Sequence, residues 1–426
     1  MNSSEHRKPI SWKVRSALPL IIGSSASQVI VLASTFAVTF LYAPHEFGVY
    51  SQIVSIASVL APVMTLSLES FIIPSGSDQR AKSLSIKGIT ILIVNAILIF
   101  FAILIWNFLY ESKNYSYFLS PIVLYFGLLL GCLYGIYAIV FQLVLREREF
   151  KKLAFRGPIQ NSSIGIFQIS CHFTSLKIYG LVIGEIFGRI IGIASLIPSA
   201  LRIFQSKNPI LNPKTDWKPN REPIWRNFLA IASEIASISF VVLFIAGIFG
   251  NSESGQFALA QRIINFPVVV LGAVLAQFLL ATGSAAMRQK SQITLIEFDV
   301  IMKKLLFTGI FLALSIYLFA PVLTNLFLGD QWIDATEYVR YLSPFLVISF
   351  VWNPISTFFY IYMEWGKFLF ISFVRLITMI LIGIIINFLN LDMKTSIILF
   401  ALGSSVIQVF GLFLVRKIVK NFVPFT

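Results

Sequence analysis

Long apolar segments separated by short charged connections fill most of this chain, and they restrict its fold more than any other feature. About twelve segments can be distinguished, each near the roughly 20 residues that a helix needs to cross a bilayer. They lie near residues 17–43, 47–73, 88–110, 118–145, 153–175, 179–202, 225–250, 255–286, 304–327, 338–362, 368–388 and 396–415. The pattern predicts an all-α membrane protein of about twelve transmembrane helices.

Composition excludes a water-soluble fold. The mean hydropathy is +0.84 and only 12% of the residues are charged, whereas soluble domains are roughly one quarter charged. The first apolar segment follows a polar, basic stretch and has no small-residue cleavage site, so we expect a first span rather than a removed signal peptide.

Sequence motifs for chemistry are absent. The chain has no P-loop, no His-Glu-x-x-His and no paired CxxC. His172 has no second ligand at metal spacing, and His6 and His45 fall in a tail and a loop, so no metal site is expected. We therefore predict that the protein is not an enzyme and holds no cofactor, apart from a coupling proton or sodium ion.

The net charge of +14 indicates topology rather than nucleic-acid binding, because the basic residues are concentrated in alternate connections. Lysines and arginines near spans are retained on the cytoplasmic side. The opposite connections hold only Lys113, Lys177, Arg340 and Lys394. This asymmetry predicts cytoplasmic N- and C-termini and an even number of spans, with loop charges facing anionic membrane lipids.

The longest polar connection, near residues 203–224, lies at the middle of the chain and predicts two lobes of six helices. Two short signatures recur at about half the chain length, as a repeat would produce. Residues 46–50 (EFGVY) are echoed 207 residues later by ESGQF, and residues 149–152 (EFKK) are echoed 215 residues later by EWGK. We predict an N-terminal lobe over 1–203, a cytoplasmic linker over 204–224 and a C-terminal lobe over 225–426, with the substrate path between the lobes.

Four stretches spread over nearly the full chain carry a family resemblance by their order and spacing. They are 44–50 (PHEFGVY), 180–185 (GLVIGE), 255–262 (GQFALAQR) and 326–332 (LFLGDQW). With them the sequence resembles the Wzx-type polysaccharide flippases, which belong to the superfamily that also contains the MATE exporters and the lipid II flippases.

The resemblance implies a MATE-like bundle in the bacterial inner membrane. Its cargo would be an undecaprenyl-diphosphate-linked oligosaccharide, the repeat unit of an O-antigen, capsule or related polysaccharide, moved from the cytoplasmic to the periplasmic leaflet by alternating access. A polysaccharide polymerase and a chain-length regulator would be partners.

Two other functions are weighed against this one. A MATE-type multidrug/cation antiporter fits less well, because the first span lacks the acidic residue that many MATE exporters use for cation coupling. A membrane-embedded polysaccharide polymerase fits less well again, because the external connections are too short for the large catalytic loop of such enzymes.

Five ionisable residues inside predicted spans are the first candidates for function, since a charge at bilayer depth is costly. Arg189, Arg262 and Arg375 are substrate-pathway candidates, because the guanidinium fork matches phosphate oxygens. Glu234 and Glu185 are candidates for ion coupling. Structural alternatives stay open: Glu185 and Arg189 are spaced i, i+4 and can neutralise each other, and Glu234 can pair with an arginine of a neighbouring span.

Uncharged polar residues share helix faces in two predicted spans. Gln28 belongs to such a face in the first span, and Asn161 and Gln168 belong to one in the fifth. These three are further substrate-pathway candidates. The alternative is that they form hydrogen bonds between helices, a common use of polar residues in membranes.

Overall fold

The computed structural model describes residues 10–75, 77–111, 120–147, 149–174, 179–205, 221–272 and 295–421, with positions 275, 276, 279 and 283. Within these residues the chain is helical and forms no strand. The predicted all-α fold is confirmed.

Every predicted span corresponds to a helix or to a helix with a short continuation. The first six spans are α1 (Ile10–Leu41), α2 (Pro44–Thr65) with the short η1 (Leu68–Phe71), α3 (Asp78–Glu111), α4 (Pro121–Arg146), α5 (Phe150–His172), and α6 (Gly180–Ala194) with α7 (Ile197–Gln205). The last six are α8 (Arg221–Phe249), α9 (Asn251–Pro267), α11 (Leu295–Phe327), α12 (Ile333–Ile355), α14 (Trp365–Leu389) and α15 (Met393–Asn421). The π-helical η3 (Val268–Gly272) continues α9. Helix α12 is preceded by η4 (Asp330–Trp332) and followed by α13 (Thr357–Ile361).

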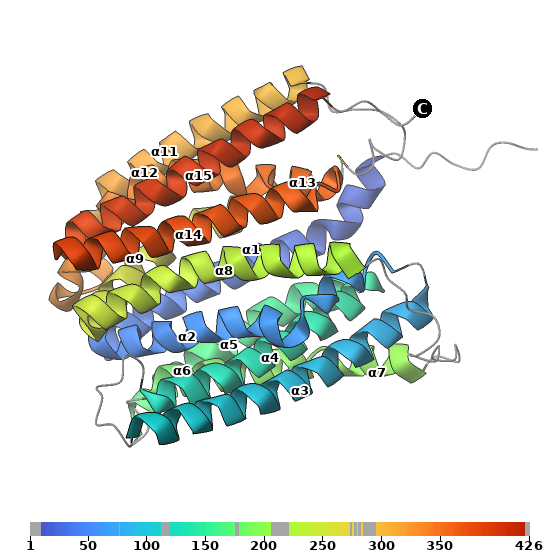
Figure 1. Cartoon of the computed structure of the whole chain (residues 1–426), viewed down its shortest axis with the longest axis horizontal. Coiled ribbons are helices and arrows are strands. Elements are labelled where there is room, and N and C mark those ends of the chain that lie inside the picture. The colour runs from blue at the N-terminus through green and yellow to red at the C-terminus, as the bar shows by residue number, and fades with distance from the viewer. Residues whose placement is uncertain are drawn as a thin grey trace, which may run out of the picture.

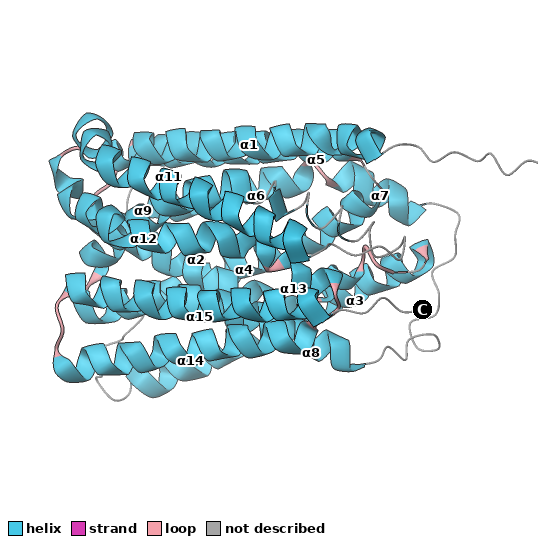
Figure 2. Cartoon of the chain, turned by 90° about the horizontal axis from the view of Figure 1, so that it is seen from above, coloured by secondary structure: helices cyan, strands magenta, loops and turns pink. Residues whose placement is uncertain are grey.

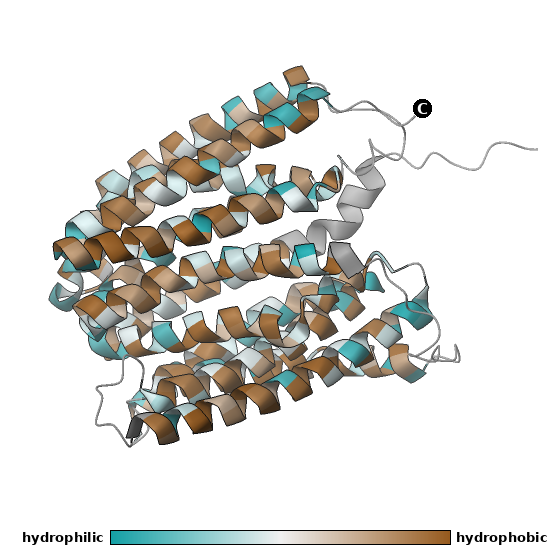
Figure 3. Ribbon diagram, viewed as in Figure 1, coloured by the Kyte–Doolittle hydropathy of each residue, from teal (hydrophilic) through white to brown (hydrophobic). Residues whose placement is uncertain are grey.

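Ten of the described helices are long and apolar enough to cross a membrane, and hydrophobic residues dominate their length in Figure 3. The two other predicted spans, α5 and α9, are more polar. Helix α5 packs against α1 and α6, and α9 packs against α2, α8 and α12. Both can carry polar side chains because neighbouring helices cover much of their surface.

The start of α1 and the end of α15 lie at the same end of the bundle, opposite the turns that join α1 to α2 and α8 to α9 (Figure 1). An even number of crossings produces this arrangement. Which end faces the cytoplasm stays a prediction of the charge count, and we call the end with the α1–α2 and α8–α9 turns the outer end on that basis.

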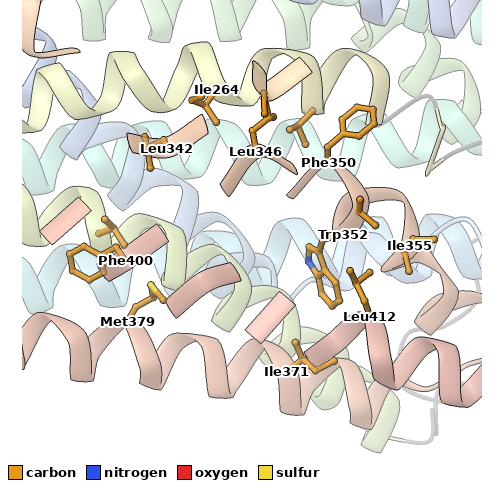
Figure 4. Packing of buried hydrophobic residues seen from close by; sticks show 14 of the residues in the cluster. Ile264, Leu342, Leu346, Phe350, Trp352, Ile355, Ile371, Met379, Phe400 and Leu412 are labelled. Atoms are coloured by element: carbon orange, nitrogen blue, oxygen red, sulfur yellow. The ribbon is translucent and has the colours of Figure 1, made fainter. Parts of the chain in front are cut away.

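The largest hydrophobic core is built from the second half of the chain alone. Its buried residues all fall between 230 and 419, and Figure 4 shows Trp352 of α12 close to Ile371 of α14 and Leu412 of α15. At Gly411 a Cβ atom would lie 2.3 Å from the Trp352 ring, so the absent side chain makes room for the indole. The second core combines residues of α1, α2, α4 and α6 with a few from α9 and from the α11–α12 region.

The signature at 149–152 has the same local structure as its copy at 364–367. Glu149 and Glu364 precede the first residues of α5 and α14 with similar backbone angles, φ −73° and ψ 54° against φ −90° and ψ 50°. Each forms an ion pair with the lysine three residues later, at 2.8 Å and 2.7 Å. The division at 204–224 stays a prediction, because residues 206–220 of that linker lie outside the described residues.

Candidate functional site

A cavity of about 270 Å³ lies between α1, α2, α8 and α9, so that both halves of the chain form its wall. Figure 2, which views the bundle from above, shows α1 and α9 on one side of α2. Six polar side chains besides Tyr50 line it: Gln28, Ser51, Ser55, Gln261, Arg262 and Asn265. The cavity is smaller than the roughly 300–1,000 Å³ of most small-molecule sites, so it has room for a compact polar group only.

Arg262 of α9 supplies the positive charge of this cavity. Its Nη1 donates to Thr35 Oγ1 of α1 at 3.0 Å, and its Nη2 donates to the Tyr50 hydroxyl of α2 at 3.4 Å. The guanidinium carbon lies 5.2 Å from the centre of the Phe47 ring. Every contact recorded for it is with a neutral group, and among the described residues no carboxylate lies within ion-pair distance. An unneutralised guanidinium in a membrane cavity is suited to bind an anion.

Glu185 and Arg189 form an ion pair on α6, with Arg189 Nε 2.8 Å from Glu185 Oε1. Glu185 is buried, with 4% of its surface exposed, and it also accepts hydrogen bonds from the hydroxyls of Tyr50 and Tyr134. The Arg189 guanidinium lies over the Tyr134 ring at 4.4 Å. Neither Glu185 nor Arg189 lines the cavity, although Tyr50 connects the pair to Arg262.

Glu234 and Arg375 form a second pair, between α8 and α14. Arg375 Nη1 lies 2.6 Å from Glu234 Oε1, and both side chains are largely buried. One further atom of each, Glu234 Oε2 and Arg375 Nε, is buried without a hydrogen-bond partner among the described residues. Both residues lie outside the cavity wall, so the geometry shows an interhelical pair, and their roles in transport stay predictions.

The three uncharged substrate-pathway candidates lie in different surroundings. Gln28 lines the cavity. Asn161 donates to Ser27 Oγ of α1 at 2.6 Å, and Gln168 donates to the Leu181 carbonyl of α6 at 3.0 Å. These two hydrogen bonds connect α5 to α1 and α6. Neither Asn161 nor Gln168 lines the cavity.

Neutralising one member of the α8–α14 pair is expected to destabilise the protein more than neutralising both. Arg375→Met leaves the Glu234 carboxylate buried without its partner, which costs about 3–5 kcal/mol in the free energy of unfolding. The double variant E234Q/R375M removes both charges and should recover most of the loss in thermal unfolding and in membrane abundance. Lys367→Met, which breaks the exposed pair with Glu364, is the control. A double variant that is stable but inactive would assign Arg375 or Glu234 to transport itself.

Near the outer end α2 and α9 cross in close contact. We call this crossing the latch: Gly48, Ser51 and Gln52 of α2 with Asn251, Ser254 and Gly255 of α9. A Cβ atom on Gly48 would lie 1.8 Å from the Asn251 carbonyl oxygen, and one on Gly255 would lie 1.9 Å from the Pro44 carbonyl oxygen. Gly48 and Gly255 are 207 residues apart, as are Pro44 and Asn251. The latch is therefore a reciprocal contact between the two copies of one repeated signature.

Hydrogen bonds hold the latch. Gln52 Nε2 donates to Asn251 Oδ1 at 2.7 Å, and the hydroxyl oxygens of Ser51 and Ser254 lie 3.5 Å apart. Beside it, the indole of Trp332 and the amide of Gln331 both donate to the Thr39 carbonyl of α1, each at 2.9 Å. The connection between α11 and α12 thus contacts the first half of the chain at the outer end.

Several residues of this site were missed by sequence reasoning. Gln261 and Asn265 flank Arg262 at i, i+4 spacing, a signal that could have been used. Tyr50 and Thr35 had no such signal for contact with Arg262, because they come from different helices and more than 200 residues separate them from it. Only the folded chain shows that their hydroxyls meet one guanidinium.

Comparison with known families and with curated protein sequences gives two findings. A family model described as "Polysaccharide biosynthesis protein" matches residues 38–337. No curated protein sequence matches the chain.

Solved transporter structures share the fold. The chain is similar to the outward-facing form of a multidrug resistance MATE family transporter of the MOP superfamily, with a TM-score of 0.65, 16% identity and coverage of 95% of both chains. It is similar to a MOP superfamily transporter from Pyrococcus furiosus Vc1, whose structure is described as having a binding pocket of reverse polarity, with a TM-score of 0.64, 16% identity and 95% coverage of both chains. An inward-facing MATE family transporter gives a TM-score of 0.62 at 15% identity, over 95% of this chain and 94% of the other. The fold is that of a multi-pass membrane transporter.

Proposed function

Because the chain belongs to the polysaccharide biosynthesis protein family, we propose that it flips an undecaprenyl-diphosphate-linked oligosaccharide from the cytoplasmic to the periplasmic leaflet of the bacterial inner membrane. The transporter fold and the family provide the general class. The lipid-linked glycan, the direction of movement and the membrane belong to the proposal.

The observation that carries the proposal is Arg262 in the cavity wall. A lipid-linked diphosphate concentrates negative charge at the junction of lipid and sugar, and arginine can bind two of its oxygens at once. Gln28, Gln261 and Asn265 line the same cavity and provide amide groups for sugar hydroxyls or phosphate oxygens. Among the described residues, no Asp or Glu side chain lines the cavity, which favours an anionic cargo over a cationic drug.

The cycle we propose is alternating access. The cavity, at about 270 Å³, is too small for an oligosaccharide, so the helices around it must separate during transport. The latch joins α2 to α9 at the outer end, and in this cycle the glycan leaves on the periplasmic side only after α2 and α9 part.

The proposed cycle includes coupling to an ion. Glu185 and Glu234 are its candidates, with a proton or a sodium ion as the coupled species. Each carboxylate binds an arginine, at 2.8 Å and 2.6 Å, so a proton on either one would weaken an ion pair. Protonation would thereby change the packing of α6, or of α8 against α14.

Deletion of the gene tests the function as a whole. Without the transporter, lipid-linked repeat units should accumulate on the cytoplasmic face of the membrane, and surface polysaccharide should be lost. Both are measured by extracting the lipid-linked glycans and by staining surface polysaccharide. Normal surface polysaccharide in the deletion strain would remove the proposal, and a complemented strain is the control.

A further inference from the structure

We propose that Tyr50 is a positioning residue for cargo recognition: it holds the Arg262 guanidinium in place by linking it to the buried carboxylate of Glu185. This inference rests on the proposed function, in which Arg262 binds the diphosphate. Tyr50 lines the cavity, and the inference connects it to Glu185, which lies behind the cavity wall. Neither the family nor the fold assigns this role.

The Glu185 carboxylate distributes its two oxygens between different partners. Oε1 accepts hydrogen bonds from Arg189 Nε at 2.8 Å and from the Tyr134 hydroxyl at 3.1 Å. Oε2 accepts one from the Tyr50 hydroxyl at 3.0 Å. The Tyr50 hydroxyl therefore links the Glu185 carboxylate to Arg262 by hydrogen bonds.

The direction of these hydrogen bonds follows from the chemistry of the groups. A hydroxyl has one hydrogen, and an ionised carboxylate can only accept. The Tyr50 hydrogen therefore points to Glu185, and an oxygen lone pair is left for Arg262 Nη2 at 3.4 Å.

Thr35 repeats this arrangement on the other side of the guanidinium. Its hydroxyl hydrogen is donated to the Val31 carbonyl of its own helix at 2.7 Å, so its oxygen accepts from Arg262 Nη1 at 3.0 Å. Two hydroxyls from α1 and α2 thus present lone pairs to an arginine of α9. Without Glu185 as acceptor, the Tyr50 hydrogen would be free to turn toward the guanidinium.

The consequence is a guanidinium that is fixed but not neutralised. Arg189, Glu185 and Arg262 together carry one net positive charge, which an anion in the cavity would balance. Fixing the side chain before the anion arrives lowers the entropy that binding must remove. Loss of the Tyr50 hydroxyl should therefore weaken anion binding even though the guanidinium charge is intact.

The chain provides a matched control, because two tyrosines donate to the same carboxylate. Tyr50 contacts Arg262, whereas the hydroxyl of Tyr134 contacts Glu185 alone among the hydrogen bonds recorded for it. Tyr50→Phe and Tyr134→Phe each remove one oxygen atom, keep the ring and take one hydrogen bond from Glu185. They differ in whether a contact with Arg262 is lost.

The experiment measures the Kd of farnesyl diphosphate, as a short lipid-diphosphate probe, for the purified full chain in lipid nanodiscs. Tyr50→Phe should weaken binding about tenfold, whereas Tyr134→Phe should stay within about twofold of the unmodified protein. The unfolding temperatures of both variants should fall, because each loses a hydrogen bond to Glu185. Equal Kd values for the two variants, or unchanged or tighter binding by Tyr50→Phe, would overturn the positioning role.

Arg262→Ala separates failure of this inference from failure of the proposed function. If Arg262→Ala binds the probe as the unmodified protein does, Arg262 is not the diphosphate site and both proposals fall. If Arg262→Ala loses binding while Tyr50→Phe and Tyr134→Phe behave alike, the diphosphate site stands and only the role of Tyr50 is wrong.

Discussion

Replacing Arg262 with alanine is expected to reduce transport to the level of a deletion strain while the amount of protein in the membrane stays unchanged. The side chain lines the cavity and bears the one charge that its described wall contains. Loss of two charge-assisted hydrogen bonds to a diphosphate, each worth about 1.5–3 kcal/mol, would weaken cargo binding by about 100-fold or more. Complementation of the deletion strain, scored by surface polysaccharide, measures the effect, and immunoblotting of membranes measures abundance.

Two further variants make this result specific. Arg340→Ala removes an exposed arginine of α12, which lies over the Tyr317 ring, and should complement fully. Arg262→Lys keeps the charge but loses the planar fork, so it should retain part of the activity. Full activity of Arg262→Ala at normal abundance would exclude Arg262 from the cargo path.

A disulfide across the latch is expected to stop transport completely and reversibly. The hydroxyl oxygens of Ser51 and Ser254 lie 3.5 Å apart, so cysteines at these positions are close enough for a small adjustment to form the bond. The double variant S51C/S254C would hold α2 against α9 and prevent the outer end from opening. Surface polysaccharide should disappear under oxidising conditions and return with a membrane-permeant reductant.

The cross-linking experiment needs a protein without the two native cysteines. Cys132 and Cys171 are free and should be replaced by alanine so that only the new pair can react. Each single variant, S51C or S254C, should transport equally well with and without reductant. Continued transport by a protein shown to be fully cross-linked would mean that α2 and α9 need not part, and would contradict the alternating-access cycle.

The helices could be predicted from the sequence because apolar length is a local property. Each predicted span overlaps a helix, including α5, where Arg156, Gln160 and Asn161 dilute the apolar signal. The pairing of Glu185 with Arg189 was also accessible, since both lie one turn apart on α6. The repeated glycine signatures were visible as strings, but their mutual contact in the latch was not.

Contacts between distant helices could not be predicted in this way. Glu234 and Arg375 are 141 residues apart, and periodicity along one helix does not specify the rotation of another against it. The same limit applies to Gln28 and Asn161, which have similar polar settings in the sequence. In the structure Gln28 lines the cavity, whereas Asn161 donates a hydrogen bond to Ser27. The packing of α5 against α1 places Asn161 in the interface between these two helices.

The polar character of α5 and α9 has a consequence for biogenesis. A lysine or arginine at the centre of a lone helix raises its insertion free energy by about 2.5–3.5 kcal/mol. Arg262 lies within α9, whereas Arg156 lies in the second turn of α5, where the cost is lower. Neither helix is suited to leave the translocon into lipid by itself. Helix α5 would enter the bilayer together with its neighbour α6, and α9 with α8. Arg262, the proposed cargo ligand, would then also make membrane integration a cooperative step.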